Sequence, residues 1–207
     1  MVLARNADSL LVDSSCFVNF AGKGDPGHLL RVISYLRSHT KARIVEEVER
    51  ELSRLAALRD RRQQLVHPGL AMWSNLRDRP ARVSVNRNST HQMADIIRAL
   101  RQPGDHKLAH HGEAATIVKA MQTGALAILD DRGAKAFARL RAVQFISTPQ
   151  LVAQMVVDKD LGHDDGLAVY RHAVPDTLDD RSPFPTERYY REELLRALAA
   201  FKDAGLR

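Results

Sequence analysis

The chain of 207 residues is long enough for one large domain, or for one domain with an appendage. An apolar fraction of 44% and a charged fraction of 27% exclude a disordered or fibrous protein. The single cysteine, Cys16, excludes an intramolecular disulfide and a cysteine-rich zinc module, so a reducing, cytoplasmic location is expected. No apolar run approaches the roughly 18 residues of a membrane span, which predicts a soluble protein with no membrane partner.

The formal net charge of +6 is unevenly distributed. Residues 1–150 carry 23 Lys and Arg against 14 Asp and Glu, a net +9, whereas residues 151–207 carry 8 against 11, a net −3. Most basic residues of the first segment are arginines, whose guanidinium groups match phosphate oxygens in a bidentate way. Nucleic acid is therefore a candidate partner, with a generic arginine-rich surface as the alternative.

The first half of the chain alternates short apolar runs with helical patterns. Residues 10–12 predict a buried strand that ends in a loop at Asp13, and 28–38 predict an amphipathic helix. A second strand is expected at 42–45, followed by a helix over 46–58 with one apolar stripe. Residues 59–90 show no clear pattern, apart from an edge-strand pattern at 83–85.

The same alternation continues in the second half. The pattern predicts two helices, then a strand, a helix and a further short strand, over residues 92–100, 112–121, 125–129, 135–140 and 143–146 respectively. Strands that alternate with helices of this length predict an α/β fold with a parallel sheet.

The character of the sequence changes near residue 151. A short helix at 151–157 gives way to an acidic, proline-containing stretch, and an amphipathic helix is expected at 187–201. We therefore divide the chain into a domain over 1–150 and an extension over 151–207. The extension is interpreted either as an appendage packed on the core or as an arm that binds a partner.

Two of the predicted strands end in carboxylates: Asp13 follows the first, and Asp130 and Asp131 follow the strand over 125–129. Ligands of parallel α/β sheets bind outside the carboxyl ends of the strands, where such side chains converge. Converging carboxylates are costly unless a cation lies between them. Hard oxygen ligands select Mg²⁺ or Mn²⁺.

Two glutamates extend this candidate site. Glu51 lies on the helix after the second strand, and Glu113 follows Gly112 at the start of another helix. Each also has a simpler explanation, because Glu51 fits a solvated helix face and Glu113 complements the helix dipole. His106, His110 and His111 resemble a metal cluster, but no cysteine or carboxylate completes a zinc pattern, so surface or RNA contact is the favoured role.

Together these motifs resemble the PIN domain, a family of metal-dependent nucleases, over roughly residues 9–150. The matching segments are Leu-Leu-Val-Asp13-Ser14-Ser15, Val48-x-x-Glu51-Leu52, Gly112-Glu113-Ala114-Ala115 and Ala-Ile-Leu-Asp130-Asp131-Arg132-Gly133. The resemblance implies a Rossmann-like parallel sheet with helices on both faces. It also implies Mg²⁺ or Mn²⁺ ions that support hydrolysis of RNA phosphodiester bonds.

The resemblance also implies roles for individual residues. Asp13, Glu51, Glu113 and Asp131 are the expected catalytic acids; Asp13, Glu113 and Asp131 would bind metal, with Asp130 left as the competing neighbour of Asp131. One of Ser14 and Ser15 would hydrogen-bond a metal ligand. Both serines, and Arg54, Arg59 and Arg62 of the basic segment, are also candidate nucleic-acid contacts, with solvation of the helix surface as the alternative role for each arginine. Glu113 departs from the aspartate that many family members carry.

The leading hypothesis is therefore a Mg²⁺- or Mn²⁺-dependent endoribonuclease, which the resemblance suggests is the toxin of a toxin-antitoxin pair and a homodimer. A second hypothesis is a PIN-like module that binds RNA or a protein without cutting, with 151–207 as its docking element. A third, a phosphatase-like or receiver-type protein, lacks the sequence context of an aspartate nucleophile.

Overall fold

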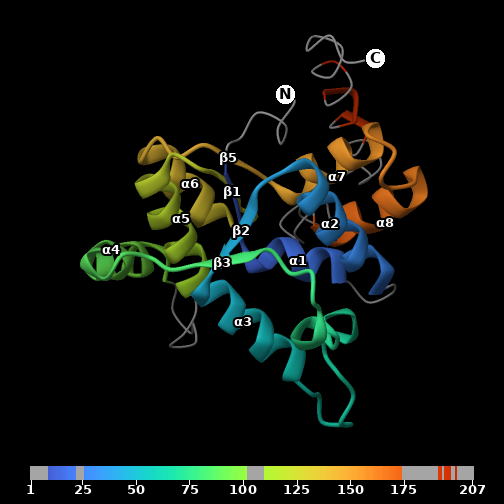
Figure 1. Cartoon of the computed structure of the whole chain (residues 1–207), viewed down its shortest axis with the longest axis horizontal. Coiled ribbons are helices and arrows are strands. Elements are labelled where there is room, and N and C mark those ends of the chain that lie inside the picture. The colour runs from blue at the N-terminus through green and yellow to red at the C-terminus, as the bar shows by residue number, and fades with distance from the viewer. Residues whose placement is uncertain are drawn as a thin grey trace, which may run out of the picture.

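The protein is an α/β structure built on one parallel sheet of five strands in the order β3-β2-β1-β4-β5 (Figure 1). The computed structural model describes residues 9–21, 26–101 and 110–173, together with 191, 192, 194–196 and 199. The parallel sheet and its flanking helices confirm the fold class predicted from the sequence. The strands are β1 (Leu10–Val12), β2 (Ala42–Val45), β3 (Ala81–Val83), β4 (Leu126–Ile128) and β5 (Phe145–Ile146).

The central strands β1 and β4 are buried along their whole length. They consist of continuous apolar residues because helices cover both faces of a parallel sheet. Strand β3 lies at the sheet edge, and it begins two residues before the edge strand expected at 83–85. The sequence pattern there is weak because β3 is largely exposed.

Eight α-helices and three short 3₁₀ helices are present in the described residues. The α-helices are α1 (Ser14–Ala21), α2 (Pro26–His39), α3 (Glu46–Ala57), α4 (Thr90–Leu100), α5 (His111–Thr123), α6 (Arg132–Leu140), α7 (Thr148–Val157) and α8 (His163–Ala173). The 3₁₀ helices are η1 (Pro68–Leu70), η2 (Trp73–Asn75) and η3 (Arg87–Ser89). The helices expected within 28–58, 92–100, 112–121, 135–140 and 151–157 are all found, most of them slightly longer than predicted.

Helices α1 and α8 were not predicted from the sequence. Helix α1 begins at Ser14, directly after β1, where the polar residues indicated a loop. It forms because Cys16, Phe17 and Phe20 enter the core on its inner side. Helix α8 lies in the stretch interpreted as an acidic extension, and it packs on α1 and α7.

The helices form two layers around the sheet (Figure 1). On one side α5 packs against β1, β2 and β4, and α3, α4 and α6 pack against α5. On the other side α1 contacts α2 and α8, and α7 contacts α8. None of the helices in the described part of the chain has both the length and the apolar character needed to cross a membrane.

The predicted domain boundary at residue 150 lies inside α7. Leu151, Val152 and Met155 of α7, and Val169 of α8, belong to the same buried core as the sheet. Residues 191, 192, 194–196 and 199 are helical, whereas the rest of the helix expected at 187–201 lies outside the described residues.

The order in which successive strands join the sheet reverses at β1. The chain passes from β1 to β2 on one side, and it later places β4 on the other side of β1. In doubly wound sheets, this switch point opens a crevice at the carboxyl ends of the strands, where ligands bind. The Asp13 amide continues the pairing by donating to the carbonyl oxygen of Ile128 at 3.3 Å, so the ends of β1 and β4 are held together.

Candidate functional site

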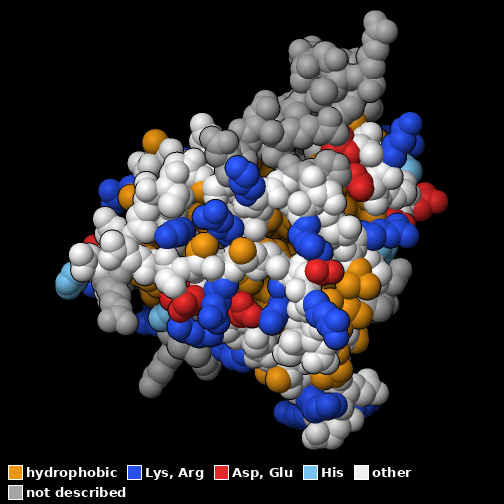
Figure 2. All heavy atoms as spheres, viewed as in Figure 1, with side chains coloured by type: hydrophobic (Ala, Val, Ile, Leu, Met, Phe, Trp, Pro, Cys, Tyr) orange, Lys and Arg blue, Asp and Glu red, His pale blue; other side chains and the backbone are white. Residues whose placement is uncertain are grey.

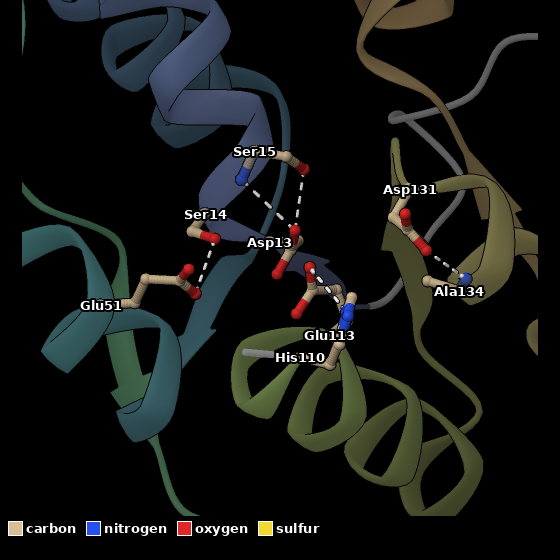
Figure 3. Close-up of polar contacts among 8 residues, drawn as sticks. All are labelled: Asp13, Ser14, Ser15, Glu51, His110, Glu113, Asp131 and Ala134. Atoms are coloured by element: carbon tan, nitrogen blue, oxygen red, sulfur yellow. Dashed lines mark hydrogen bonds and ion pairs between the residues drawn. The ribbon is translucent and has the colours of Figure 1, made fainter. Parts of the chain in front are cut away.

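Four of the predicted acids surround the switch point (Figure 3). Asp13 follows β1, Glu51 lies on α3, Glu113 lies in the first turn of α5, and Asp131 caps the start of α6. Figure 3 shows Asp13 in the middle, with Glu51 on one side, Asp131 on the other and Glu113 beside it. Residues separated by more than a hundred positions therefore meet at one end of the sheet. We call these four residues the acid cluster.

Asp13 is the most deeply buried member of the acid cluster, with 0% of its surface exposed. Its Oδ2 accepts hydrogen bonds from Ser15, at 2.8 Å from the hydroxyl and 3.3 Å from the backbone amide. Its Oδ1 is buried with no hydrogen-bond partner among the described residues. Burial raises the pKa of Asp13 well above its ordinary value, and the neighbouring Glu113 and Glu51 raise it further.

The carboxylate of Glu51 is hydrogen-bonded by Ser14. The Ser14 hydroxyl donates to Oε2 of Glu51 at 2.9 Å and so joins α1 to α3. The start of α5 approaches this pair closely at Gly112. A Cβ on Gly112 would lie 2.7 Å from Oε2 of Glu51 and 3.3 Å from Oδ1 of Asp13. A glycine is therefore required for both carboxylates to lie against α5 undisturbed.

Glu113 carries a strongly perturbed carboxyl group. Burial raises its pKa to about 7, and the charges of Glu51 and Asp131 act in the same direction, against a hydrogen bond from its own backbone. Its Oε2 is buried and has no hydrogen-bond partner in the described part of the chain. The Nδ1 of His110 lies 3.9 Å from Oε1 of Glu113, and His110 has a left-handed backbone conformation with φ of 64°. His110 is thus a neighbour of the cluster that sequence reasoning did not assign to it.

The structure separates the two consecutive aspartates that follow β4. Oδ1 of Asp131 accepts a 2.7 Å hydrogen bond from the Ala134 amide, and this N-cap fixes the carboxylate at the start of α6. Both oxygens of Asp130 are used elsewhere. They accept from the Thr148 amide at 2.7 Å, the Thr148 hydroxyl at 2.6 Å and the Asn19 side chain at 2.8 Å.

Asp130 is therefore not brought to the other acids, although it was a candidate metal ligand. It connects the end of β4 to the start of α7 and to α1. The residues that hold it, Asn19 and Thr148, were not singled out from the sequence, because neither belongs to a recognisable pattern. Gly112 was quoted only as part of a motif, and its steric role becomes evident from the positions of the two carboxylates.

A cavity of about 120 Å³ adjoins the acid cluster between α3 and α5. It is lined by Glu47, Arg50, Glu51, Arg54, His111 and Gly112. Arg50 pairs with Glu46 and Glu47 of its own helix, at 3.2 and 3.8 Å. Arg54 is exposed one turn further along α3.

Of the other predicted nucleic-acid contacts, two arginines lie away from the cavity and two serines form hydrogen bonds to the acid cluster. Arg59 and Arg62 are exposed beyond the end of α3. The hydroxyls of Ser14 and Ser15 each donate to an acid of the cluster, as the resemblance implied for one of them. His106 lies outside the described residues.

The donor set fits a hard divalent cation. Asp13, which is buried, and Glu113, which is partly exposed, each have one buried oxygen without a partner and a raised pKa, so the charge of their ionised forms lacks compensation. In the arrangement present, no three His, Cys, Asp or Glu side chains of the described residues lie close enough together to hold a metal ion. Mg²⁺ needs fewer, because it keeps several waters and is often bound by one or two carboxylates plus substrate phosphate.

Comparison of the chain with models of protein families, with curated proteins and with solved structures finds no match.

Proposed function

We propose that this protein is a Mg²⁺- or Mn²⁺-dependent endoribonuclease of PIN type, which hydrolyses RNA phosphodiester bonds at the acid cluster. The observation that carries the proposal is the pair of buried, unpartnered oxygens, Oδ1 of Asp13 and Oε2 of Glu113, at the switch point of a parallel sheet. A buried carboxylate oxygen without a partner destabilises a protein, so the presence of two such oxygens is best explained by a cation that binds them.

Asp13 and Glu113, the pair with unpartnered oxygens, would hold the metal, and Asp131 is the third acid that the family resemblance assigns to it. A bound Mg²⁺ or Mn²⁺ supplies a lowered pKa for a coordinated water and offsets the negative charge that develops on the phosphate. Ser15 fixes the carboxylate plane of Asp13 through two hydrogen bonds, and Ser14 does the same for Glu51 through one. Arg54, on the wall of the adjoining cavity, is available to bind a phosphate of the substrate.

A second candidate is a non-catalytic module that binds RNA or a protein. The observation that favours it is the spacing of the acids, since no three candidate ligands of the described residues converge on one point. A toxin restrained by an antitoxin, acting as a homodimer in the cytoplasm, remains a prediction of the family resemblance.

The test is cleavage of an end-labelled RNA pool by the purified chain in Mn²⁺, in Mg²⁺ and in EDTA. Asp13→Asn, Glu113→Gln and Asp131→Asn each remove one charge with little change of shape. Asp95→Asn is the matched control, because Asp95 is an exposed carboxylate on α4 that pairs with Arg98. We expect metal-dependent cleavage that the three cluster variants lose and the control retains.

Cleavage that persists in EDTA, or in all three cluster variants, would contradict a carboxylate-held metal site. Absence of cleavage by folded protein that still binds RNA would favour the non-catalytic module. A circular dichroism spectrum of each variant separates loss of chemistry from loss of fold.

A further inference from the structure

Residues 58–66 form a small closed hairpin beyond the end of α3. The Val66 amide donates to the carbonyl of Leu58 at 3.1 Å, and the Asp60 amide donates to the carbonyl of Gln64 at 2.9 Å. Arg59 and Leu65 form an antiparallel bridge between these two bonds. The segment therefore has a defined shape, although its sequence shows no strand pattern.

The side chain of Asp60 fixes the turn of this hairpin. Its Oδ1 accepts hydrogen bonds from the amides of Arg62 at 2.8 Å and Gln64 at 3.0 Å. The Arg59 guanidinium is also used internally, because it donates to the carbonyl of Gln63 at 2.8 Å. Thus the one acid of the hairpin faces its own backbone, and one of its three arginines closes the turn.

The remaining two arginines, Arg61 and Arg62, are exposed at the tip. Within the described residues neither guanidinium has an ion-pair partner. Figure 2 shows Lys and Arg side chains gathered at the projecting end of the molecule where Figure 1 places this segment. A pair of guanidinium groups without ion-pair partners, on a projection of fixed shape, is suited to binding phosphate. The planar guanidinium group of arginine can donate two parallel hydrogen bonds to phosphate oxygens.

The hairpin is a direct continuation of the helix that carries Glu51. From Glu51 to the end of α3 the rise is about 9 Å, and the extended residues that follow keep the tip within roughly 25 Å of Glu51. Arg54 lies between the two, on the cavity wall. Arginines therefore follow one another outward from the acid cluster to the tip, over a length that several nucleotides span.

We propose that the hairpin of residues 58–66 is an RNA-binding arm that holds the substrate backbone several nucleotides from the acid cluster. This inference rests on the proposed function for the identity of the substrate, and it adds that long RNA is preferred over short RNA. The exposed apolar residues Leu58 and Val66 lie at the base of the hairpin, whereas the tip carries the charge, which favours a phosphate backbone over an apolar protein surface.

The experiment measures binding without cleavage, by fluorescence anisotropy in EDTA with unstructured RNAs of about 4 and about 16 nucleotides. The test variant combines Arg61→Gln with Arg62→Gln. The control combines Arg139→Gln with Arg141→Gln, two exposed arginines in the last turn of α6 and directly after it. We expect the test variant to bind the long RNA about tenfold more weakly, with a salt slope reduced by about 1.4, and to bind the short RNA unchanged.

A second variant removes the hairpin without removing its base. The backbone hydrogen bond between Leu58 and Val66 allows residues 59–65 to be replaced by Asn-Gly, which favours a two-residue hairpin turn. It should show at least the same loss for the long RNA. The proposal of an RNA-binding arm would be overturned if both hairpin variants bound the long RNA as tightly as the unchanged chain. It would also be overturned if the unchanged chain bound no RNA. Cleavage of the short RNA in Mn²⁺ tests the proposed function separately, because it does not need the arm.

Discussion

The Ser14 hydroxyl lies 2.9 Å from Oε2 of Glu51, so the first turn of α1 is bonded to the middle of α3. The next residue, Ser15, forms the equivalent bond to Asp13. Two consecutive serines thus orient two different carboxylates of one cluster. Hydroxyls of this kind fix the direction of metal ligands in many sites and tune their affinity.

Ser14→Ala should therefore weaken the site without unfolding the protein. We expect a loss of about 10- to 100-fold in the cleavage rate, because Glu51, one of the proposed catalytic acids, loses the bond that orients it. Ser84→Ala is the matched control, since the Ser84 hydroxyl makes a similar 2.7 Å bond to Glu46 of the same helix, outside the cluster. The measurement is cleavage rate against Mn²⁺ concentration. Equal cleavage rates for the two variants at every Mn²⁺ concentration would argue against an orienting role for Ser14.

Stability without metal should fall as the pH rises. Glu113 has a pKa of about 7 in the folded protein, above its ordinary value of 4.5, so the folded state holds a proton that the unfolded state releases. The contribution of Glu113 to the free energy of unfolding therefore decreases between pH 4.5 and about 7, by about 3 kcal/mol in total, and is constant above. Urea denaturation in EDTA at several pH values measures this. Glu113→Gln should flatten much of the decrease, and an unchanged pH profile would show that Glu113 is not its source.

A divalent cation should raise the melting temperature by compensating the buried charges. At about 100 times its dissociation constant the stabilisation is about 3 kcal/mol. Asp13→Asn should melt at a higher temperature than the unchanged chain in EDTA, because it removes a desolvated charge, and should gain little from Mn²⁺. Thermal denaturation with Mn²⁺ and with EDTA checks both parts. A large Mn²⁺ shift retained by Asp13→Asn would place cation binding elsewhere.

Gly112→Ala should disturb the acid cluster more than the fold. The new Cβ would lie 2.7 Å from Oε2 of Glu51, so this carboxylate must move. The better helix propensity of alanine, about 1 kcal/mol, offsets much of the stability lost. We expect at least a tenfold loss of cleavage with a melting temperature close to that of the unchanged chain. Gly162→Ala, where the nearest atom is 3.5 Å away, should change neither quantity.

Replacement of the two consecutive aspartates by alanine should affect different properties: stability for Asp130 and the response to Mn²⁺ for Asp131. Asp130→Ala leaves the Thr148 amide without its acceptor, and we expect a loss of about 2–4 kcal/mol in the free energy of unfolding, with the Mn²⁺ shift retained. Asp131→Ala removes an N-cap, which costs about 1 kcal/mol, and the Mn²⁺ shift should disappear. Urea denaturation with and without Mn²⁺ distinguishes them, and the reverse pattern would exchange their roles.

Most of the fold could be predicted because its buried strands are continuous apolar runs. The strands at Leu10–Val12 and Leu126–Ile128 were found within one residue at each end, and the parallel sheet followed from their alternation with helices. Helix α1 was missed because its polar first turn, with Ser14 and Ser15, has the composition of a loop. Only its tertiary role, in which Phe17 packs 5.0 Å from the ring of Trp73, makes this segment a helix.

Asp13, Glu113 and Asp131 could be selected from the sequence because each follows a strand or begins a helix, whereas Glu51, in the middle of α3, was selected for its place on the helix after the second strand. The orientation of the side chains could not be predicted. Asp130 and Asp131 are equivalent in sequence, and the choice between them depends on Thr148 and Asn19, which lie 18 and 111 positions away. The hairpin at 58–66 was equally hidden, because its shape comes from the Asp60 side chain bonded to backbone amides rather than from apolar residues.

The pairing of β1 with β4 also determines when the acid cluster is assembled. Leu10 pairs with Leu126 and Val12 with Ile128, so more than a hundred residues must be synthesised before Asp13 gains its neighbour Asp131. Contacts of such long sequence separation form late, because the entropy of closing the chain opposes them. A nascent chain on the ribosome, or a fragment that stops before β4, therefore carries Asp13, Glu51 and Glu113 without the framework that unites them with Asp131.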